Sequence, residues 1–326
     1  MHQVVRSVLA AAAVASAFIS STCLAQQSAW PTRPIKLVIP FVAGGAADLI
    51  ARAYADRAGA ALGQSIIIEN RGGAGGNIAA SAVVRSDPDG YTLFFGSTGP
   101  AALNSLMYKN MTFDPLNDFT PIVMIGKTPI IIVARPNAPV KTLKELVAYA
   151  KANPGTLSAG FPGSGTLGHI TGVLFGQRSG ADLKHVQYRG GGPLITDLVG
   201  GHIDIGMDAI TPYVPQVQDG NLIGLAVASA ERLKQLPNVP TASEAGLSGF
   251  EASVWYCLLA PSGTPAEIVA KLNHASNAFI RAEGTAELFE KLGVVPAGGS
   301  PEELKRFMAK EVESWGPVIK GAKIEF

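Results

Sequence analysis

The 326-residue sequence predicts an α/β fold built on parallel sheets. Short apolar runs of strand length alternate along the chain with longer segments of helical periodicity, which is typical of parallel strands joined by helices. Glycine-rich turns follow several of the apolar runs, as they do where strands lead into helices. Hydrophobic residues make up 47% of the chain, beside 37 glycines and 22 prolines, which indicates a turn-rich globular protein and not a disordered one.

The N-terminal segment has the pattern of a secretory signal peptide. Arg6 supplies a positive charge, Val8–Ile19 is an almost wholly apolar run, and Cys23-Leu24-Ala25 fits a small-residue cleavage site. The apolar run is too short for a membrane span, which takes about 20 residues. We expect residues 1–25 to be a signal peptide removed after Ala25, without lipidation of Cys23, because no leucine stands where a lipobox requires one. The mature protein is then periplasmic or secreted.

The charge balance argues against a nucleic-acid partner. The chain has 26 Lys and Arg against 25 Asp and Glu, and loss of the leader with Arg6 leaves 25 of each. A nucleic acid or an anionic membrane surface needs a basic face, which this balance does not predict. Cys257 is the only cysteine beyond the leader, and its apolar neighbours predict a packing thiol in a buried strand.

The predicted elements follow these patterns in chain order. The strands are Ile35–Ile39, Ser65–Glu69, Thr92–Phe95, Ile122–Ile125, Ile130–Ala134, Leu157–Gly160, His185–Tyr188, Ile203–Met207, Leu222–Ala228 and Ser253–Ala260. The helices include Asp48–Leu62, Thr142–Ala152, Pro193–Val199, Pro265–Ala282 and Pro301–Lys320. The last two begin with a proline, whose missing N–H is harmless in the first turn of a helix.

Two strand-like segments predict a division into two domains. Thr128–Pro136 and Phe250–Pro261 each stand between a region that is already complete and a new one, and each ends in a proline-containing turn. We therefore expect domain 1 to comprise residues 30–130 plus 253–326, and domain 2 residues 131–252. The cleft then lies between the domains, and the two crossover strands form the hinge.

Glycine-rich loops that follow apolar strands are the candidates for a ligand site. Glycine lets backbone N–H groups approach a ligand, and a helix that starts at such a loop adds partial positive charge. In open α/β sheets ligands bind beyond the carboxyl ends of the strands, where such loops gather. The loops predict contacts with a carboxylate through Phe41, Val42, Ala43, Gly44, Gly45, Ser97, Thr98, Ser164, Gly165, Thr166, Gly190, Gly191 and Gly192.

Two titratable residues complete the candidate set. Asp208 ends a predicted strand and is expected to face the cleft, where its carboxylate receives a ligand amine or orients a loop; the sequence favours neither. His169 lies in the first turns of a helix, where a structural role is favoured over contact with a ligand. Asp48 suits the first turn of its own helix through the helix dipole and is expected to be structural.

The sequence contains no complete motif of an enzyme, a nucleotide site or a metal site. Gly126-Lys127-Thr128 resembles the end of a P-loop, but Pro121 stands where the first glycine belongs. Ser164 lacks the frame of a nucleophile elbow. The histidines are scattered without the spacing of metal ligands. We expect no catalysis, no metal and no cofactor.

In combination the motifs resemble the Bug family, the extracytoplasmic receptors of tripartite tricarboxylate transporters. The resemblance covers essentially the whole mature chain. It rests on Trp30-Pro31-Thr32-Arg33-Pro34-Ile35, Pro40-Phe41 with Gly44-Gly45 and Asp48, Asn70-Arg71 with Gly73–Gly76, Pro88–Leu93, Gly163–Thr166 with His169, Tyr188 with Gly190–Pro193, Asp197-Leu198, Gly200-Gly201 and Asp204.

The resemblance implies a type II periplasmic-binding-protein fold with two α/β domains joined by two crossover strands around a central cleft. It also implies a monomer that captures a small carboxylate, such as a di- or tricarboxylate, an aromatic acid or an amino acid, for membrane permease subunits. Two alternatives stay open at this point. One is a periplasmic sensor module of the same fold, and the other is a hydrolase or lyase acting on a small acid.

Overall fold

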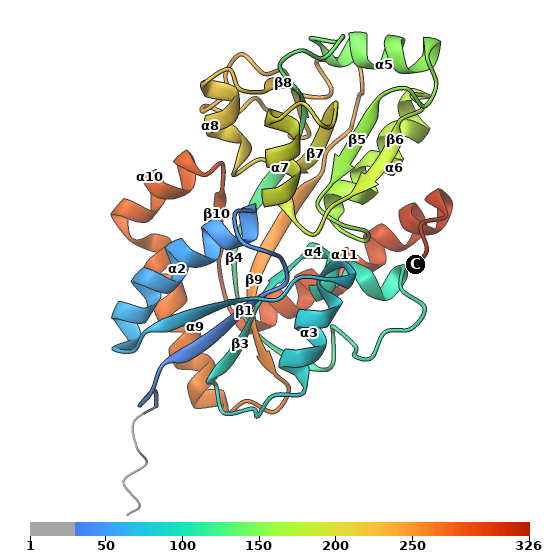
Figure 1. Cartoon of the computed structure of the whole chain (residues 1–326). Coiled ribbons are helices and arrows are strands. Elements are labelled where there is room, and N and C mark those ends of the chain that lie inside the picture. The colour runs from blue at the N-terminus through green and yellow to red at the C-terminus, as the bar shows by residue number, and fades with distance from the viewer. Residues whose placement is uncertain (1–29) are drawn as a thin grey trace, which may run out of the picture. The chain divides into compact units, whose positions relative to one another are not determined.

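The computed structural model describes residues 30–326, which Figure 1 shows as a mixed α/β fold. The predicted signal peptide, residues 1–25, lies outside the described residues. Ten strands form one mixed sheet: β1 (Ile35–Ile39), β2 (Ile66–Asn70), β3 (Thr92–Ser97), β4 (Phe119–Ala134), β5 (Ser158–Phe161), β6 (Lys184–Gln187), β7 (Ile205–Ala209), β8 (Ile223–Val227), β9 (Ser253–Pro261) and β10 (Val295–Gly298).

The helices follow the strands along the chain. They are α2 (Ala46–Leu62), α3 (Asn77–Val84), α4 (Thr98–Ala101), α5 (Leu143–Ala152), α6 (Leu167–Ser179), α7 (Gly191–Val199), α8 (Tyr213–Gln218), α9 (Ala266–Arg281), α10 (Glu283–Lys291) and α11 (Pro301–Ala322), with short 3₁₀ turns η1 (Ala74–Gly76) and η2 (Leu103–Leu106). Local signals explain several ends. Helix α11 starts at a capping box of Ser300 and Glu303 with Pro301 in its first turn, and α2 ends at Gly63 with a left-handed φ of 70°.

The sheet has two parallel parts. On one side β1 lies between β2 and β3 and is parallel to both. On the other side β5 lies between β6 and β7 and is parallel to both. Each of these parts has the strand–helix alternation that the sequence predicts, because parallel neighbours need a crossover connection.

The central strands are antiparallel, which corrects the expectation of wholly parallel sheets. Strand β9 runs antiparallel to both β3 and β4, and β4 runs antiparallel to β7 and β8. The chain enters the middle segment along β4 and leaves it along β9, so the two adjacent strands must run in opposite directions. Residues of β4 up to Pro129 pair with β9, and those from Ile130 onward pair with β7.

Most predicted elements lie within two residues of the observed ones at each end. The main difference is that Ile122–Ile125 and Ile130–Ala134 form a single strand, β4, which passes through Pro121 and Pro129. Helices α3, α4, α8 and α10 and strand β10 lie outside the predicted set, and α6 is predicted only through the helical position of His169. Strand β10 contains Pro296 and Gly298 and is largely exposed, so it lacks the buried apolar pattern by which strands are recognised.

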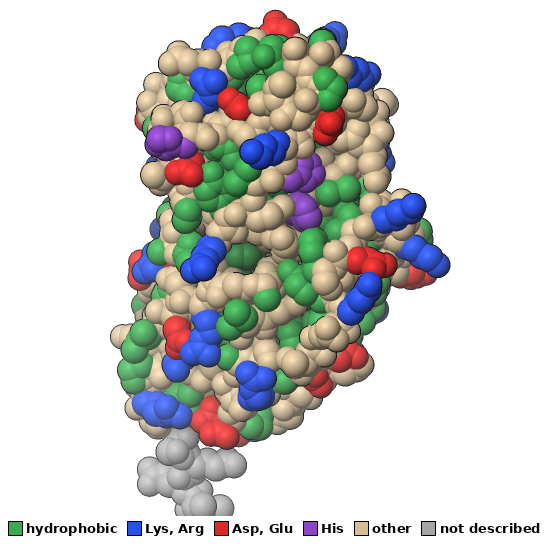
Figure 2. All heavy atoms as spheres, turned by 45° about the vertical axis from the view of Figure 1, so that its right-hand side comes forward, with side chains coloured by type: hydrophobic (Ala, Val, Ile, Leu, Met, Phe, Trp, Pro, Cys, Tyr) green, Lys and Arg blue, Asp and Glu red, His purple; other side chains and the backbone are tan. Residues whose placement is uncertain are grey.

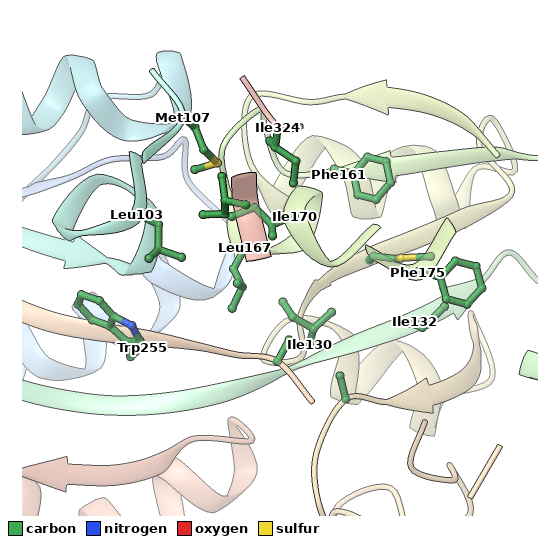
Figure 3. Close-up of a cluster of buried hydrophobic side chains, with 14 of the residues drawn as sticks. Leu103, Met107, Ile130, Ile132, Phe161, Leu167, Ile170, Phe175, Trp255 and Ile324 are labelled. Atoms are coloured by element: carbon green, nitrogen blue, oxygen red, sulfur yellow. The ribbon is translucent and has the colours of Figure 1, made fainter. Parts of the chain in front are cut away.

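A continuous apolar core connects the segments. Leu103, Met107 and Trp255 belong to the same buried cluster as Phe161 and Phe175, as Figure 3 shows. Helix α6 contributes Leu167 and Ile170 to the middle of this cluster, and Ile324 near the C-terminus packs there as well. Residues Arg33–Phe326 form one compact unit, so the division into residues 30–130 plus 253–326 and 131–252 stays a prediction.

Within the described residues, no helix has both the length and the apolar character that a membrane span requires. On the face shown in Figure 2, Lys and Arg side chains are interspersed with Asp and Glu side chains. The balance of charges in the sequence is therefore also a local balance on that face. Cys257 is fully buried in β9, as predicted for a packing thiol, and burial raises the pKa of its thiol.

Candidate functional site

Loops from both ends of the sheet enclose a small cavity, here called the inner cavity. Its volume is about 40 Å³, enough for a few water molecules. Segments that lie far apart in the sequence line it: Phe41, Gly45, Ala46, Ala47, Ser97, Thr98, Gly99, Pro100, Pro162, Thr166, Leu167, Gly168, Gly191, Asp208, Ala209, Val254 and Tyr256. Four of the predicted glycine-rich loops therefore meet at one place.

Three of the longer helices begin at the inner cavity, as does the four-residue helix α4. Helix α2 brings Ala46 and Ala47, α6 brings Leu167 and Gly168, and α7 brings Gly191. The first N–H groups of a helix have no partner within it, and the helix dipole adds partial positive charge at this end. Helices α2 and α7 also have no side-chain cap. The inner cavity is thus surrounded by positive helix ends, although no Lys, Arg or His lines it.

Close backbone contact requires glycine where α2 and α7 begin. A Cβ on Gly45 would lie 3.3 Å from the backbone nitrogen of Gly191, and a Cβ on Gly192 would lie 2.5 Å from the carbonyl oxygen of Ala43. Real Cβ atoms essentially never make the second contact. The loop Phe41–Gly45 and the loop Gly190–Gly192 therefore touch across the inner cavity because both lack side chains there.

A buried carboxylate holds the Phe41–Gly45 loop in shape. Asp48 accepts hydrogen bonds from the N–H of Gly44 at 3.0 Å, from Arg52 Nε at 3.0 Å and from Asn70 Nδ2 at 3.0 Å. Asn70 Nδ2 also donates to the carbonyl oxygen of Phe41 at 3.0 Å. Burial tends to raise the pKa of Asp48, but these hydrogen bonds outweigh it and lower the pKa below 3.8. Asp48 is therefore structural, and it occupies the N–H of Gly44.

Three serine and threonine side chains line the inner cavity. Thr166 caps α6: its Oγ1 accepts from the N–H of His169 at 3.4 Å and donates to the carbonyl oxygen of Gly163 at 2.7 Å. Thr98 Oγ1 accepts from the N–H of Trp255 at 2.9 Å. Ser97 precedes α4 but makes no capping hydrogen bond. Its hydroxyl is therefore the one most available to a ligand.

Asp208 is the one charged side chain among the residues that line the inner cavity. It lies within β7 and is 6% exposed. Its Oδ1 accepts from the N–H of Ala209 at 2.7 Å, and its Oδ2 accepts from the hydroxyl of Tyr213 at 3.3 Å. Burial raises the pKa of Asp208 to about 7, against the opposing effect of these two hydrogen bonds.

Other predicted site residues lie close by without lining the inner cavity. Val42, Ala43, Gly44, Gly190 and Gly192 form the loop contact just described or flank it. Ser164 lies at a second, outer cavity of about 590 Å³. A Cβ on Gly165 would lie 2.7 Å from the ring of Tyr108, so that glycine packs against an aromatic side chain.

The structure places His169 away from both cavities. Its ring packs against Phe161, His185 and Phe326, with centroid distances of 5.5, 5.9 and 5.5 Å. Burial, with a smaller effect of His185, lowers the pKa of His169 to about 4. The ring is therefore neutral at neutral pH and adds no charge to the site. This placement agrees with the structural role that the sequence favours.

The outer cavity adjoins the inner one. Phe41 and Pro162 line both, and Arg189 is the only charged side chain on the wall of the outer cavity. The Gly72–Gly76 loop forms much of that wall. Phe41 thus lies between the inner and the outer cavity.

The sequence analysis missed several residues that line the inner cavity, and two of them lie on β9. Val254 and Tyr256 come from β9, where the intervening Trp255 points away and packs on Phe307 with a centroid distance of 5.4 Å. Successive side chains of a strand point to opposite faces. The alternation of side chains along β9 therefore predicts that Val254 and Tyr256 share one face. Because the residues on both faces are apolar, the sequence did not indicate which face lines the inner cavity.

Residues 30–326 contain no group of three His, Cys, Asp or Glu side chains that could hold a metal ion. The geometry instead defines a binding site. Backbone and hydroxyl donors surround a cavity, and crossover strands and loops enclose it. The chain belongs to the family of tripartite tricarboxylate transporter receptors. The model of this family matches residues 50–324. As a member of a receptor family it is a solute-binding receptor and not an enzyme.

Solved structures agree with this assignment. The chain is similar to R. palustris Rpa4515 with adipate, at 38% identity and a TM-score of 0.88, covering 91% of this chain and 99% of that one. It is similar to the periplasmic binding protein BugD, at 34% identity and a TM-score of 0.88 with the same coverage. MatC from Rhodopseudomonas palustris with bound malate matches at 33% identity and a TM-score of 0.85, covering 89% and 100%. The mixed α/β periplasmic-binding-protein fold is thereby confirmed.

Proposed function

We propose that this receptor captures a small carboxylate in the inner cavity and delivers it to membrane permease subunits of a tripartite tricarboxylate-type transporter. The observation that carries the proposal is the convergence of the N-terminal ends of α2, α6 and α7 on one cavity that no cationic side chain lines. Such ends hold anions through N–H groups and the helix dipole. Adipate and malate, bound by two relatives, are both small dicarboxylates.

The predicted contacts divide into two groups in this proposal. Ser97, Thr98, Thr166 and the N–H groups at the three helix starts hold the carboxylate directly. The glycines of the Gly44–Gly45 and Gly190–Gly192 loops allow those starts to approach each other. His169 supports α6 from behind and does not contact the ligand.

The ligand enters by a hinge motion between residues 30–130 plus 253–326 and residues 131–252. The support is geometric. The loops that touch at the inner cavity come from different predicted domains, so a movement of these segments apart opens the inner cavity. Strands β4 and β9 are the two connections between these segments, so they supply the hinge.

A carboxylate library tests the proposal. A ligand that binds only the folded protein raises the melting temperature, by an amount that grows with its concentration relative to Kd. We expect at least one di-, tri- or monocarboxylate to stabilise the protein, and isothermal titration calorimetry to give a Kd for it. Amides or alcohols of the same carbon skeleton are the matched controls and should not bind. Stabilisation by the neutral analogues alone would contradict the proposal.

The location is proposed separately. The leader pattern of residues 1–25 and the resemblance to a periplasmic binding protein support export to the periplasm. Expression of the full chain followed by intact-mass measurement of the exported protein tests this. We expect a mature N-terminus at Gln26 and no lipid on Cys23, whereas a diacylglycerol-modified Cys23 at the N-terminus would contradict the assignment.

A further inference from the structure

Asp208 places an acidic side chain in the cavity that is proposed to bind a carboxylate, and the proposed function does not explain its presence. Its carboxyl group lines the same small cavity as the donors that would hold a carboxylate ligand. We propose that Asp208 selects carboxylates that carry a second group able to donate a hydrogen bond, a hydroxyl or an ammonium, next to the carboxylate. This inference rests on the proposed function and specifies its ligand class.

The surroundings of Asp208 leave it available to a ligand. The side chain is buried, and no Lys, Arg or His within residues 30–326 forms an ion pair with it. Its Oδ2 receives only the long 3.3 Å hydrogen bond from Tyr213, and its Oδ1 receives the N–H of the next residue, Ala209. A buried carboxylate with so few donors gains free energy from any further donor that enters the cavity.

The inner cavity has several hydrogen-bond donors but a single acidic side chain. Its other polar side chains carry hydroxyl groups, namely Ser97, Thr98, Thr166 and Tyr256, and of these Thr166 already donates to the carbonyl oxygen of Gly163. The three helix starts also present donors. Asp208 is the only acidic side chain among the lining residues. A ligand that fits this arrangement has an acceptor end for the helix starts and a donor for Asp208.

The Asp208 carboxyl group lies close to Gly191 at the start of α7. A Cβ on Gly191 would lie 2.5 Å from Asp208 Oδ2, so a side chain at the start of α7 would displace the Asp208 carboxyl group. Burial and the nearby Asp208 raise the pKa of Tyr256, and burial with Asp208 raises that of Tyr213, so both phenols remain protonated. Tyr213 on α8 and Tyr256 on β9 are the titratable groups that face Asp208.

Two ligand series that differ at one carbon test the proposal: succinate, malate and aspartate, and propionate, lactate and alanine. At pH 8 the wild-type protein should bind the hydroxy or amino member of a series at least about tenfold more tightly than the unsubstituted member, the equivalent of one hydrogen bond to a charged group. The malate and lactate arms identify a hydroxyl as the donor, and the aspartate and alanine arms an ammonium.

Variants locate the effect. Asp208→Asn keeps the shape of the side chain but removes the charge, and it should reduce the preference to within about threefold. Asp219→Asn, at the exposed C-terminal end of α8, is the matched control and should keep the full preference. A second test uses the wild type alone and so does not depend on whether the variant folds. The preference for lactate over propionate should be smaller at pH 6 than at pH 8, because protonated Asp208 donates a hydrogen bond to the ligand carboxylate itself.

The outcomes separate the two proposals. If no carboxylate binds the wild type, the proposed function fails and the inference fails with it. If carboxylates bind without a preference for a donor, if a donor-free acid binds more tightly at pH 8 than every substituted member of both series, or if Asp208→Asn retains the preference, the inference alone is overturned.

Discussion

At the scale of single residues, the fold controls the ionisation of Asp208 and His169. Asp208 and His169 both lie in the interior, and burial changes the pKa of each toward its neutral form, to about 7 and about 4. Only Asp208 lines the cavity. Its charge therefore links the stability of the receptor to the chemistry of the site.

Asp208→Asn should stabilise the protein more at pH 8 than at pH 5. The folded pKa of about 7 lies above the reference value of 3.8, so the stability that protonated Asp208 confers is complete below about pH 4 and is lost as the pH rises through 7. A difference of this size corresponds to a few kcal/mol, at about 1.4 kcal/mol per pH unit. Urea unfolding of the wild type and the variant at both pH values measures it. Equal effects of the substitution at both pH values would contradict the raised pKa.

The hydroxyls of Ser97 and Thr166 should differ in what their removal costs. Thr166 caps α6, so Thr166→Ala should destabilise the fold by about 1 kcal/mol as well as weaken ligand binding. Thr166→Ser retains both hydrogen bonds and is the matched control. Ser97 makes no cap, so Ser97→Ala should weaken binding by about one order of magnitude or more at nearly unchanged stability. Calorimetric titration and thermal unfolding of the three variants measure both quantities, and unchanged affinity in both alanine variants would exclude this site.

At the scale of elements, the first strand, loop and helix act as a preformed anion trap. Strand β1 leads into the Phe41–Gly45 loop, and Asp48, Arg52 and Asn70 hold that loop through four hydrogen bonds. The start of α2 can therefore face the inner cavity without a side-chain cap. A ligand that binds there does not have to order the loop, which lowers the cost of binding.

Asp48→Ala should weaken ligand binding although Asp48 does not line the inner cavity. The substitution removes the acceptor of the Gly44 N–H and of one of the two hydrogen bonds of Asn70 Nδ2, and a hydrogen bond to a charged group contributes at most about 1.5–3 kcal/mol. The Phe41–Gly45 loop then samples other conformations. The affinity for the ligand falls because binding has to order the loop. Asp56→Ala, an exposed position on the same helix, is the control. Titration calorimetry is the measurement, with hydrogen exchange of residues 41–45 as a second readout; if exchange there does not accelerate, the holding role is wrong.

The sequence predicted these elements because their signals are local. Apolar runs, glycines and caps identified β1, α2 and α7 within two residues, and the glycine-rich loops identified most of the backbone of the site. Contacts between distant segments carried no such signal. That β4 continues through Pro129, that Tyr256 lines the cavity and that Asp48 occupies the N–H of Gly44 all depend on pairing across the sheet or on a folded loop.

At the scale of the molecule, the site is closed on one side by packing and on the other by loops that merely touch. The buried cluster of Leu167 and Ile170 of α6 with Leu103, Trp255 and Ile324 joins the predicted domains (Figure 3). In front, the Gly44–Gly45 and Gly190–Gly192 loops meet through backbone atoms alone. Opening should therefore separate the glycine loops while the apolar cluster acts as the pivot, since packed apolar contacts cost far more to break.

Gly192→Ala should hold the receptor open. Its Cβ would lie 2.5 Å from the carbonyl oxygen of Ala43, so the loops cannot reach their present distance, whereas alanine favours helix α7 itself by up to about 1 kcal/mol. The variant should fold normally, bind the carboxylate at least about tenfold more weakly, since the α2 and α7 donors no longer reach the ligand together, and show no ligand-induced decrease in radius of gyration by small-angle X-ray scattering. Gly321→Ala on α11, where a Cβ meets nothing within 4 Å, is the control and should close like the wild type. A Gly192→Ala protein with wild-type affinity and compaction would show that closure does not bring these loops together.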